Sequence, residues 1–422
     1  MGIKDIIDTI NVDGSEPNNY TVITKKVNFN FDVEDEKLGV PKIKIFGIGG
    51  AGNNIINFLE KLRGWPNNID MWALNTDKKT LVRLKKNQVN ASLYLIGEKK
   101  LNGFGSGGDP RVGQAAFEEN KDDIERKMVD IDILFIIAGL GKGTGSGVGP
   151  EVARIAKEKN IITVSIVTLP SYIIEGKKTY ENAVISFEKF KNNSDSLCAI
   201  SNDKIISLSS DANFIEQMDK ANKEIGSIIS DFVDIVSSAG EFNIDFHDLK
   251  SFLTENKKFF HCLIKLDKTY SFDDLNNKIL LAIKNSFSTT EFSDQNINVI
   301  ANFKINTKSQ TNLISDTRKI IEGISKNNDI KLVYGIENIL DNNDEISLFI
   351  SCDEQNSEKF NIQQENENAK PFSVLTKQQK IDINEYKDYK TSKITKKLFD
   401  FDEDEVDEDT VQALTKIIKN EN

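Results

Sequence analysis

Three groups of residues in this sequence have types and spacings that suit chemistry on a phosphate. The first is GIGGAGNN (47–54), where Gly47, Gly49 and Gly52 fit the pattern G-x-G-x-x-G between an apolar run and a helical pattern. Glycines let the backbone approach a phosphate, and a helix N-terminus attracts its charge. Alone, this motif also suits a dinucleotide-binding oxidoreductase, in which Asp77 would hold a ribose.

The second group is GLGKGTGSGVGP (139–150), where glycines alternate with small hydroxyl residues just before another helical pattern. A second phosphate-binding loop supplies more backbone N–H groups than one diphosphate uses. It therefore favours a nucleoside di- or triphosphate as the ligand. The loop differs from a Walker A loop, because Lys142 is followed by Gly143 instead of Ser or Thr.

The third group follows Gly240 and consists of Asn243, Asp245 and Asp248. Asp245 and Asp248 are spaced i and i+3 at the start of a helical pattern, so both carboxylates project from one side, where they can orient a water and a hydrated cation. By spacing alone, the simpler interpretation is that they cap the helix N-terminus.

The elements around these groups predict an α/β protein with two domains. Short apolar runs alternate with helical patterns over 41–210, which predicts a parallel sheet covered on both faces. A long central helix is expected over 211–240, and a smaller α/β domain over 241–352. The expected strands are 42–48, 71–75, 132–138, 161–167 and 196–200, then 259–266, 298–305, 330–336 and 346–352, with helices at 112–129, 147–159, 272–286 and 311–323.

Composition limits the partners. The net charge of −12 and the pI near 5.0 argue against general nucleic-acid binding. No stretch approaches the roughly 18 apolar residues of a membrane span, and the start lacks a secretion signal, so we expect a cytoplasmic protein without membrane insertion. The cysteines and histidines have no metal-type spacing and are expected in the core or on the surface: Cys198, Cys262, Cys352, His247 and His261.

Both ends of the chain differ in composition from the two domains. Residues 1–40 are polar and are expected to form a disordered extension, as is the Asn-, Gln- and Lys-rich linker 353–395. The acidic tail 396–422 has Val411, Leu414 and Ile418 on one helical face. It is either a peptide that docks into a partner or a solvated acidic tail with a frayed helix.

Taken together, the motifs resemble those of FtsZ, the bacterial relative of tubulin, in order and approximate spacing over 42–350. They are GIGGAGNN (47–54), LNTD (74–77), NGFGSGGDPRVG (102–113), GKGTGSG (141–147), EGKK (175–178), NDK (202–204) and GEFNIDFHD (240–248). The resemblance implies a tubulin/FtsZ-like fold, in which a parallel-sheet GTP-binding domain is joined by a long central helix to a smaller α/β domain.

The resemblance also implies a set of residues that bind GTP. Two glycine loops would hold the phosphates, a third loop would sense the γ-phosphate, Glu175 would bind the ribose, and Asn202 and Asn222 would read the guanine. The residues implied are Gly49, Gly50, Ala51, Gly52, Asn53, Asn54, Gly105, Gly107, Gly143, Thr144, Gly145, Ser146, Gly147, Glu175, Thr179, Asn202 and Asn222. Mg²⁺ is expected on the GTP phosphates, with no protein ligand assigned.

Three positions depart from the FtsZ pattern. Lys142 replaces a glycine, so a left-handed backbone there would be strained, although its ammonium could touch a phosphate. Thr179 stands where a ribose-binding arginine is expected. Met218 stands where an aromatic residue commonly stacks on guanine, and its thioether can pack on a ring face.

The implied function is GTP hydrolysis in a head-to-tail homopolymer that scaffolds the cell-division ring beneath the inner membrane. Asn243, Asp245 and Asp248 of one subunit would act on the GTP of the next, and the tail would bind membrane-tethering and division proteins. The alternative is a divergent GTP-binding polymer or regulatory homologue with weak or no GTPase activity. A plasmid- or phage-type relative that moves DNA is a third interpretation, which the acidic run 400–409 disfavours.

Overall fold

The structure is a computed structural model, and it describes residues 41–352 with short gaps. The described residues are 41–62, 64–209, 211–237, 244–255, 258–267, 270–289, 297–306, 312–324, 331–339 and 343–352. The predictions for 1–40, 353–395, 396–422 and Asn243 lie outside these residues.

The first six strands form one parallel sheet in the order β3-β2-β1-β4-β5-β6. They are β1 (Ile43–Ile48), β2 (Ile69–Asn75), β3 (Ser92–Leu95), β4 (Ile133–Gly139), β5 (Ile162–Leu169) and β6 (Ser196–Ser201). The chain builds outward from β1 in one direction and from β4 in the other. β1 and β4 are neighbours, with Ile48 opposite Ala138, so the strand order reverses at their carboxyl ends. Parallel α/β sheets bind ligands at such a reversal.

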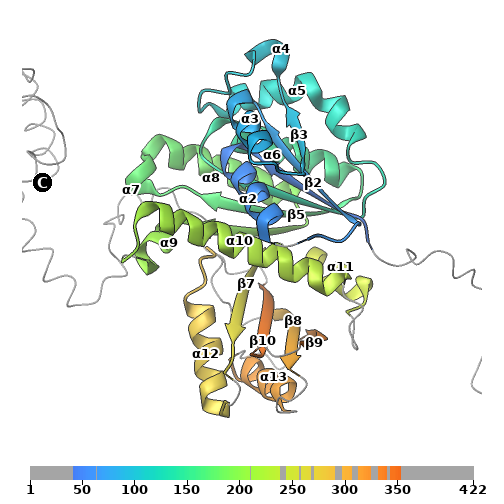
Figure 1. The fold of residues 1–422 in the computed structure, drawn as a ribbon, viewed down its shortest axis with the longest axis vertical. Helices are drawn as coiled ribbons and strands as arrows, with labels where there is room; N and C mark the ends of the chain where they lie inside the picture. The colour runs from blue at the N-terminus through green and yellow to red at the C-terminus, as the bar shows by residue number, and fades with distance from the viewer. Residues whose placement is uncertain are drawn as a thin grey trace, which may run out of the picture. The chain divides into compact units, whose positions relative to one another are not determined.

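Helices cover both faces of this sheet, as predicted. The main ones are α2 (Gly49–Leu62), α3 (Lys78–Lys86), α5 (Pro110–Arg126), α6 (Gly143–Glu158) and α8 (Lys177–Asn193), and the short ones are α4 (Glu98–Leu101), α7 (Tyr172–Glu175) and α9 (Asn202–Leu208). α2 and α3 share a core with alternate residues of β4, such as Ile133, Phe135 and Ile137. On the other face, α6 contacts both α5 and α8 (Figure 1).

The long central helix is α10 (Phe214–Ser237), whose 24 residues span roughly 36 Å. Its buried residues recur every three or four positions and face both halves of the protein. Phe232 meets Phe135 of β4 edge-on, with ring centroids 4.8 Å apart, and lies 6.1 Å from Phe349 of β10. α10 therefore belongs to one core with both halves, which places it as predicted within the described residues.

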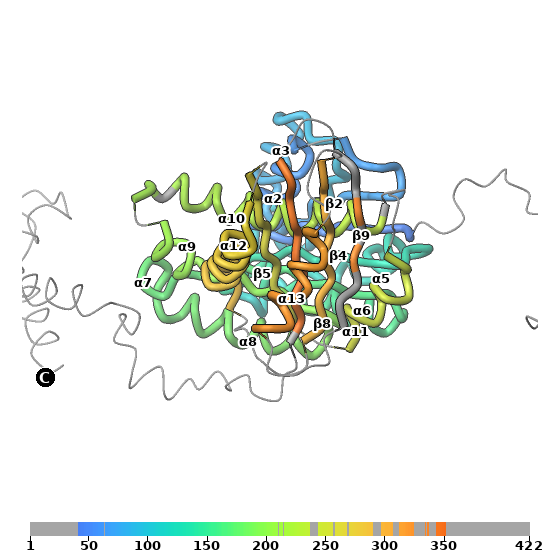
Figure 2. Tube along the Cα trace, turned by 90° about the horizontal axis from the view of Figure 1, so that it is seen from below, coloured from blue at the N-terminus to red at the C-terminus, as the bar shows by residue number. Residues whose placement is uncertain are grey.

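The second half adds four strands and three helices in its described residues. They are β7 (Lys258–Lys265), β8 (Ile297–Asn306), β9 (Lys331–Ile339) and β10 (Glu345–Cys352), with α11 (Phe246–Glu255), α12 (Phe272–Lys284) and α13 (Leu313–Ile324). Their order is β7-β10-β8-β9, and β10 runs antiparallel to both its neighbours. All four strands were predicted, but their directions were not. Figure 2 views these strands from below, in front of α10.

A buried polar network joins α10 to the second half. His261 of β7 is fully enclosed, and its Nε2 lies 2.9 Å from Asp231 of α10 and 2.7 Å from Ser347 of β10. Lys304 of β8 adds a 2.6 Å bond to Asp234. Burial alone would lower the pKa of His261, but the hydrogen bond to Asp231 and the nearby charge of Glu224 raise it to about 9.

This network predicts a dependence of stability on pH. A histidine whose folded pKa lies above its unfolded value of 6.5 stabilises the fold fully below pH 6.5, and that contribution is lost as the pH rises through about 9. Between pH 6 and 9.5, the free energy of unfolding of the wild type should therefore fall by on the order of 2–3 kcal/mol more than that of His261→Gln. Urea titrations across this range check it, and parallel pH curves for the two proteins would contradict it.

Candidate functional site

Two glycine loops meet at the carboxyl ends of β1 and β4, where the strand order reverses. Gly49 has the left-handed φ of +76°, and a Cβ there would lie 3.0 Å from the backbone N of Gly145. At Gly145, a Cβ would lie 2.2 Å from the carbonyl oxygen of Gly139. A side chain at Gly49 would separate the two loops, and one at Gly145 would distort the second loop itself, so the glycines let two helix N-termini, those of α2 and α6, open at one place.

A third loop, 102–109, closes against the second one and brings three hydroxyl groups together. Thr144 Oγ1 lies 2.7 Å from Thr76 Oγ1 and 3.3 Å from Ser106 Oγ, and all three side chains are buried. Thr76 directly follows β2, Ser106 is in the third loop, and Thr144 is in the first turn of α6. Hydroxyls beside backbone N–H groups at a helix start suit phosphate oxygens. Thr76 and Ser106 were within the quoted motifs, but only their contact with Thr144 singles them out.

The backbone at Lys142 is not strained. Lys142 is the N-cap of α6 with φ −104°, and the left-handed conformation falls on Gly141, with φ +98°. The N–H of Gly141 donates to Ser146 Oγ at 2.7 Å, which fixes the loop to the first turn of α6. The strain expected from replacing glycine by lysine is therefore absent.

The charged groups of the third loop are paired with one another. Asp109 caps α5 by accepting from the N–H of Arg111 at 2.8 Å, and its other oxygen accepts from the Arg111 guanidinium at 2.7 Å. The hydrogen bonds from Arg111, with a smaller contribution from the charge of Lys178, lower the pKa of Asp109 to about 2. Asp109 is thus ionised at neutral pH, and its charge is matched by Arg111.

The positions implied for ribose and base lie along the same edge of the sheet. Glu175 ends α7, and its Oε2 lies 2.9 Å from the Nζ of Lys142. Asn202 begins α9 directly after the carboxyl end of β6, and α10, which carries Asn222 and Met218, starts beside α9. Asn202, Asn222 and Met218 are all half-buried.

Thr179 lies against the second glycine loop. A Cβ on Gly141 would lie 2.6 Å from both Thr179 Cγ2 and the Thr179 carbonyl oxygen. Where the FtsZ pattern has an arginine, this chain therefore has a short side chain packed on the loop backbone.

The side chains of Asn53 and Asn54 are engaged within the protein. Asn53 is fully buried, donates to the Gly47 carbonyl at 2.7 Å and accepts from the Asn75 amide at 2.7 Å. Asn54 accepts from the Arg83 guanidinium at 2.9 Å. Asn53 thus ties the ends of β1 and β2 together, and the N–H groups at the start of α2 are what these positions offer a phosphate.

The glycines implied for the phosphates lie around this junction, with two kinds of surroundings. Gly143, Gly145 and Gly147 have no room for a Cβ, because a Cβ at each would lie 2.1–2.2 Å from an atom of Ser106, Gly139 or Pro110, respectively. Gly50 and Gly107 have nothing within 4 Å of a built Cβ and so border open space. The positions in contact with other loops or exposed at their rim are Gly49, Gly50, Ala51, Gly52, Gly105, Gly107, Gly143 and Gly145.

The two aspartates lie at the opposite edge of the sheet. Asp245 accepts from the N–H of His247 at 2.9 Å and so caps α11, the arrangement expected from spacing alone, while Asp248 is half-buried in the first turn. α11 leads into β7, whose first residue, Lys258, pairs with Leu197 at the amino end of β6. Within one chain, α10 therefore separates the aspartates from the glycine loops. Figure 1 shows α9, at the carboxyl edge of the sheet, beside one end of α10 and α11, which carries Asp248, beside the other.

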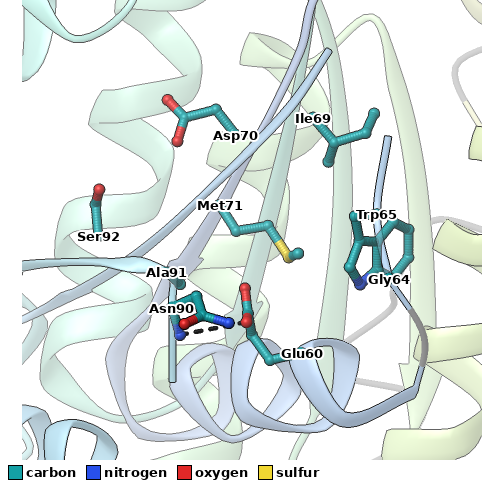
Figure 3. Close-up of a pocket in the computed structure, with 9 residues that line it drawn as sticks. All are labelled: Glu60, Gly64, Trp65, Ile69, Asp70, Met71, Asn90, Ala91 and Ser92. Atoms are coloured by element: carbon teal, nitrogen blue, oxygen red, sulfur yellow. Dashed lines mark hydrogen bonds between the residues drawn. The ribbon is translucent and has the colours of Figure 1, made fainter. Parts of the chain in front are cut away.

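A hollow of about 420 Å³ lies elsewhere, at the amino ends of β2 and β3 (Figure 3). Glu60, Trp65, Met71 and Asn90 are among its lining residues, and Glu60 accepts from the backbone N–H of Asn90. It is at the edge away from the glycine loops and holds none of the residues implied for a nucleotide.

The chain thus has an α/β fold in which two glycine loops meet at one strand-order reversal. Residues 42–210 match the family described as "Tubulin/FtsZ family, GTPase domain". The structure matches that of the empty FtsZ dimer from M. jannaschii with a TM-score of 0.64 and 26% identity, covering 76% of this chain and 90% of that one. The described fold is therefore assigned as tubulin/FtsZ-like.

Two curated relatives agree with this assignment. The cell division protein FtsZ of Aquifex aeolicus is 39% identical over 221 residues, which is 51% of this chain and 57% of that protein. The cell division protein FtsZ 1 of Methanocaldococcus jannaschii is 36% identical over 210 residues, 50% of this chain and 56% of that protein. The chain thus spans about half the length of the curated relatives it matches.

Among the helices in the described part of the chain, none has both the length and the apolar character needed to cross a membrane. Over the same residues, no group of three or more His, Cys, Asp or Glu side chains is placed to hold a metal ion.

The close approach of Gly145 to Gly139 within the second glycine loop predicts the effect of a single methyl group. Gly145→Ala places a Cβ against the Gly139 carbonyl, so the backbone of this loop must shift, and the free energy of unfolding should fall by about 1–3 kcal/mol. Gly323 of α13 has open space at its Cβ, so Gly323→Ala should raise it by up to about 1 kcal/mol. Urea unfolding of both variants checks this, and equal stability of the two would refute the close approach.

Proposed function

We propose that this chain binds GTP where its glycine loops meet and hydrolyses it at the junction between successive copies of a head-to-tail filament. The observation that carries the proposal is the position of Asp245 and Asp248, at the sheet edge opposite the glycine loops and separated from them by α10. One chain cannot bring both groups to one nucleotide, whereas two copies stacked in the same direction can.

The glycine loops supply the binding half of the site. Backbone N–H groups at the starts of α2 and α6 donate to the phosphates, and the Thr76, Ser106 and Thr144 hydroxyls add donors that turn toward an acceptor. The open space at Gly50 and Gly107 leaves room for phosphate oxygens beside the backbone. Glu175, Asn202 and Asn222 take the ribose and the base.

The aspartates supply the hydrolytic half from the next copy. A carboxylate within hydrogen-bond reach of a water orients its lone pair toward the γ-phosphate and accepts its proton. Asp248, in the first turn of α11, is assigned to the water, together with Asp245 at the start of the helix and Asn243 two residues before Asp245. Mg²⁺ held by the phosphates would offset their charge, and this fits the described residues, which provide the phosphates with hydroxyls but no carboxylate cluster.

The cellular role proposed is that of the curated relatives, which are named cell division proteins. The chain would form a filament at the division site beneath the membrane, and its tail at 396–422 would bind membrane-tethering and division proteins. Self-association has support from the FtsZ structure of M. jannaschii, which is described as a dimer. Neither nucleic-acid binding nor membrane insertion is part of the proposal.

A second candidate is a GTP-binding polymer with weak or no hydrolysis. It is favoured by the ion pair between Lys142 and Glu175, which engages the ribose-binding carboxylate, and by Thr179 in place of an arginine. GTP-dependent pelleting without phosphate release would select this candidate over the first.

Phosphate release measured against protein concentration tests the shared site. We predict that turnover per subunit falls sharply below a threshold concentration, because single subunits hold only half of the site. Asp248→Asn should reduce turnover by roughly 10²–10⁴-fold while GTP binding is retained. Glu255→Gln makes the same charge change at the end of α11, where Glu255 accepts from Asn298, and should leave turnover unchanged. Turnover per subunit that is independent of concentration would reject the mechanism.

A further inference from the structure

Lys142 lies between the phosphate loop and the residue assigned to the ribose. It is the N-cap of α6, directly before Gly143, and its ammonium lies 2.9 Å from the carboxylate of Glu175 on α7. The Lys142 side chain is 72% exposed and that of Glu175 only 24%. The ion pair therefore crosses the edge at which the proposed nucleotide enters.

The other cations near this edge have partners of their own. The Arg111 guanidinium donates two hydrogen bonds to Asp109. The charge of Lys178 also lowers the pKa of Asp109. Lys177 lies 3.8 Å from Glu181 one helical turn away. Among these described cations, Lys142 is the one whose partner is itself proposed to bind the nucleotide.

A bound nucleotide changes the balance of this pair. A lysine carries a compact charge on a flexible stem, and an ion pair whose cation is mostly in water is weak because water and salt compete with it. A diphosphate or triphosphate at the start of α6 would present several negative charges one residue from Lys142. The phosphates are then the stronger partner, and their attraction frees the Glu175 carboxylate.

We propose that Lys142 binds the phosphates of the nucleotide, leaving Glu175 as it does so and releasing that carboxylate to the ribose hydroxyls. The proposal rests on the proposed GTP site and deepens it. It assigns to Lys142 a positive charge at the nucleotide, where the FtsZ pattern has an arginine and this chain has Thr179. Lys142 is thus a binding residue for the phosphates and a positioning residue for Glu175.

Equilibrium binding of GDP, GTP and guanosine to the full chain tests this role, with competition against a fluorescent GDP analogue as the readout. Lys142→Gln should weaken GDP and GTP by about tenfold, as expected for the loss of one charge-assisted hydrogen bond, and should change guanosine by less than about twofold. Lys142→Arg keeps the charge and should retain GDP affinity within about threefold. The effect of Lys142→Gln should shrink as salt is raised.

Lys159→Gln is the matched control. Lys159 caps the other end of the same helix and lies 3.5 Å from Glu125, so the substitution removes an equivalent surface ion pair far from the nucleotide. If the wild type binds GDP and Lys142→Gln binds it equally well or more tightly, the role of Lys142 is overturned and the proposed GTP site is not. Wild type that binds no guanine nucleotide would overturn the proposed function together with this inference.

Discussion

The length of α10 is the constraint on which the proposed mechanism depends. Its start lies beside α9 at the carboxyl edge of the parallel sheet, and the chain after its end leads through α11 to the amino edge. Phe232 packs on both Phe135 and Phe349, so one core fixes the helix against both halves. Moving the aspartates toward the glycine loops of the same chain would break that core.

The proposed phosphate site depends on close backbone packing in the glycine loops, which leaves no room for side chains at several glycines. Gly145 approaches the Gly139 carbonyl so closely that even a methyl group is not accommodated, and this contact brings Thr144 to Thr76 and Ser106. The result is a cluster of hydroxyl groups beside the glycine loops, and the charged residues around it are paired: Asp109 with Arg111, and Glu175 with Lys142. We propose that, of these two ion pairs, only the one between Lys142 and Glu175 breaks when a nucleotide binds, because Lys142 then binds the phosphates.

The sequence predicted most of the strands and the long helix because buried strands and amphipathic helices each have a clear apolar period. β3 was missed because its four residues, SLYL, are only half-buried and follow a polar stretch. The antiparallel direction of β10 was beyond prediction, since alternation of apolar residues does not encode strand direction. The carboxyl-edge glycines were found from their motifs.

Side-chain partners were the part of the site that the sequence could not supply. Asn53 and Asn54 were assigned to GTP, yet their side chains bond to Gly47, Asn75 and Arg83, contacts that require residues far apart in sequence to meet. The ion pair between Lys142 and Glu175 is a similar case, with 72% and 24% exposed side chains from two different elements. The site assignments themselves remain predictions.

Mixing two inactive variants tests the shared site most directly. Gly50→Glu fits sterically, because nothing lies within 4 Å of a Cβ at Gly50, and its carboxylate would repel the phosphates while leaving Asp248 intact. Asp248→Asn keeps the phosphate loops and loses the hydrolytic carboxylate. We predict that each protein alone releases almost no phosphate and that an equimolar mixture regains up to about a quarter of wild-type turnover, because random stacking would pair intact halves at about that fraction of junctions. A mixture no more active than its two components, although both variants fold and Asp248→Asn binds GTP, would contradict the account.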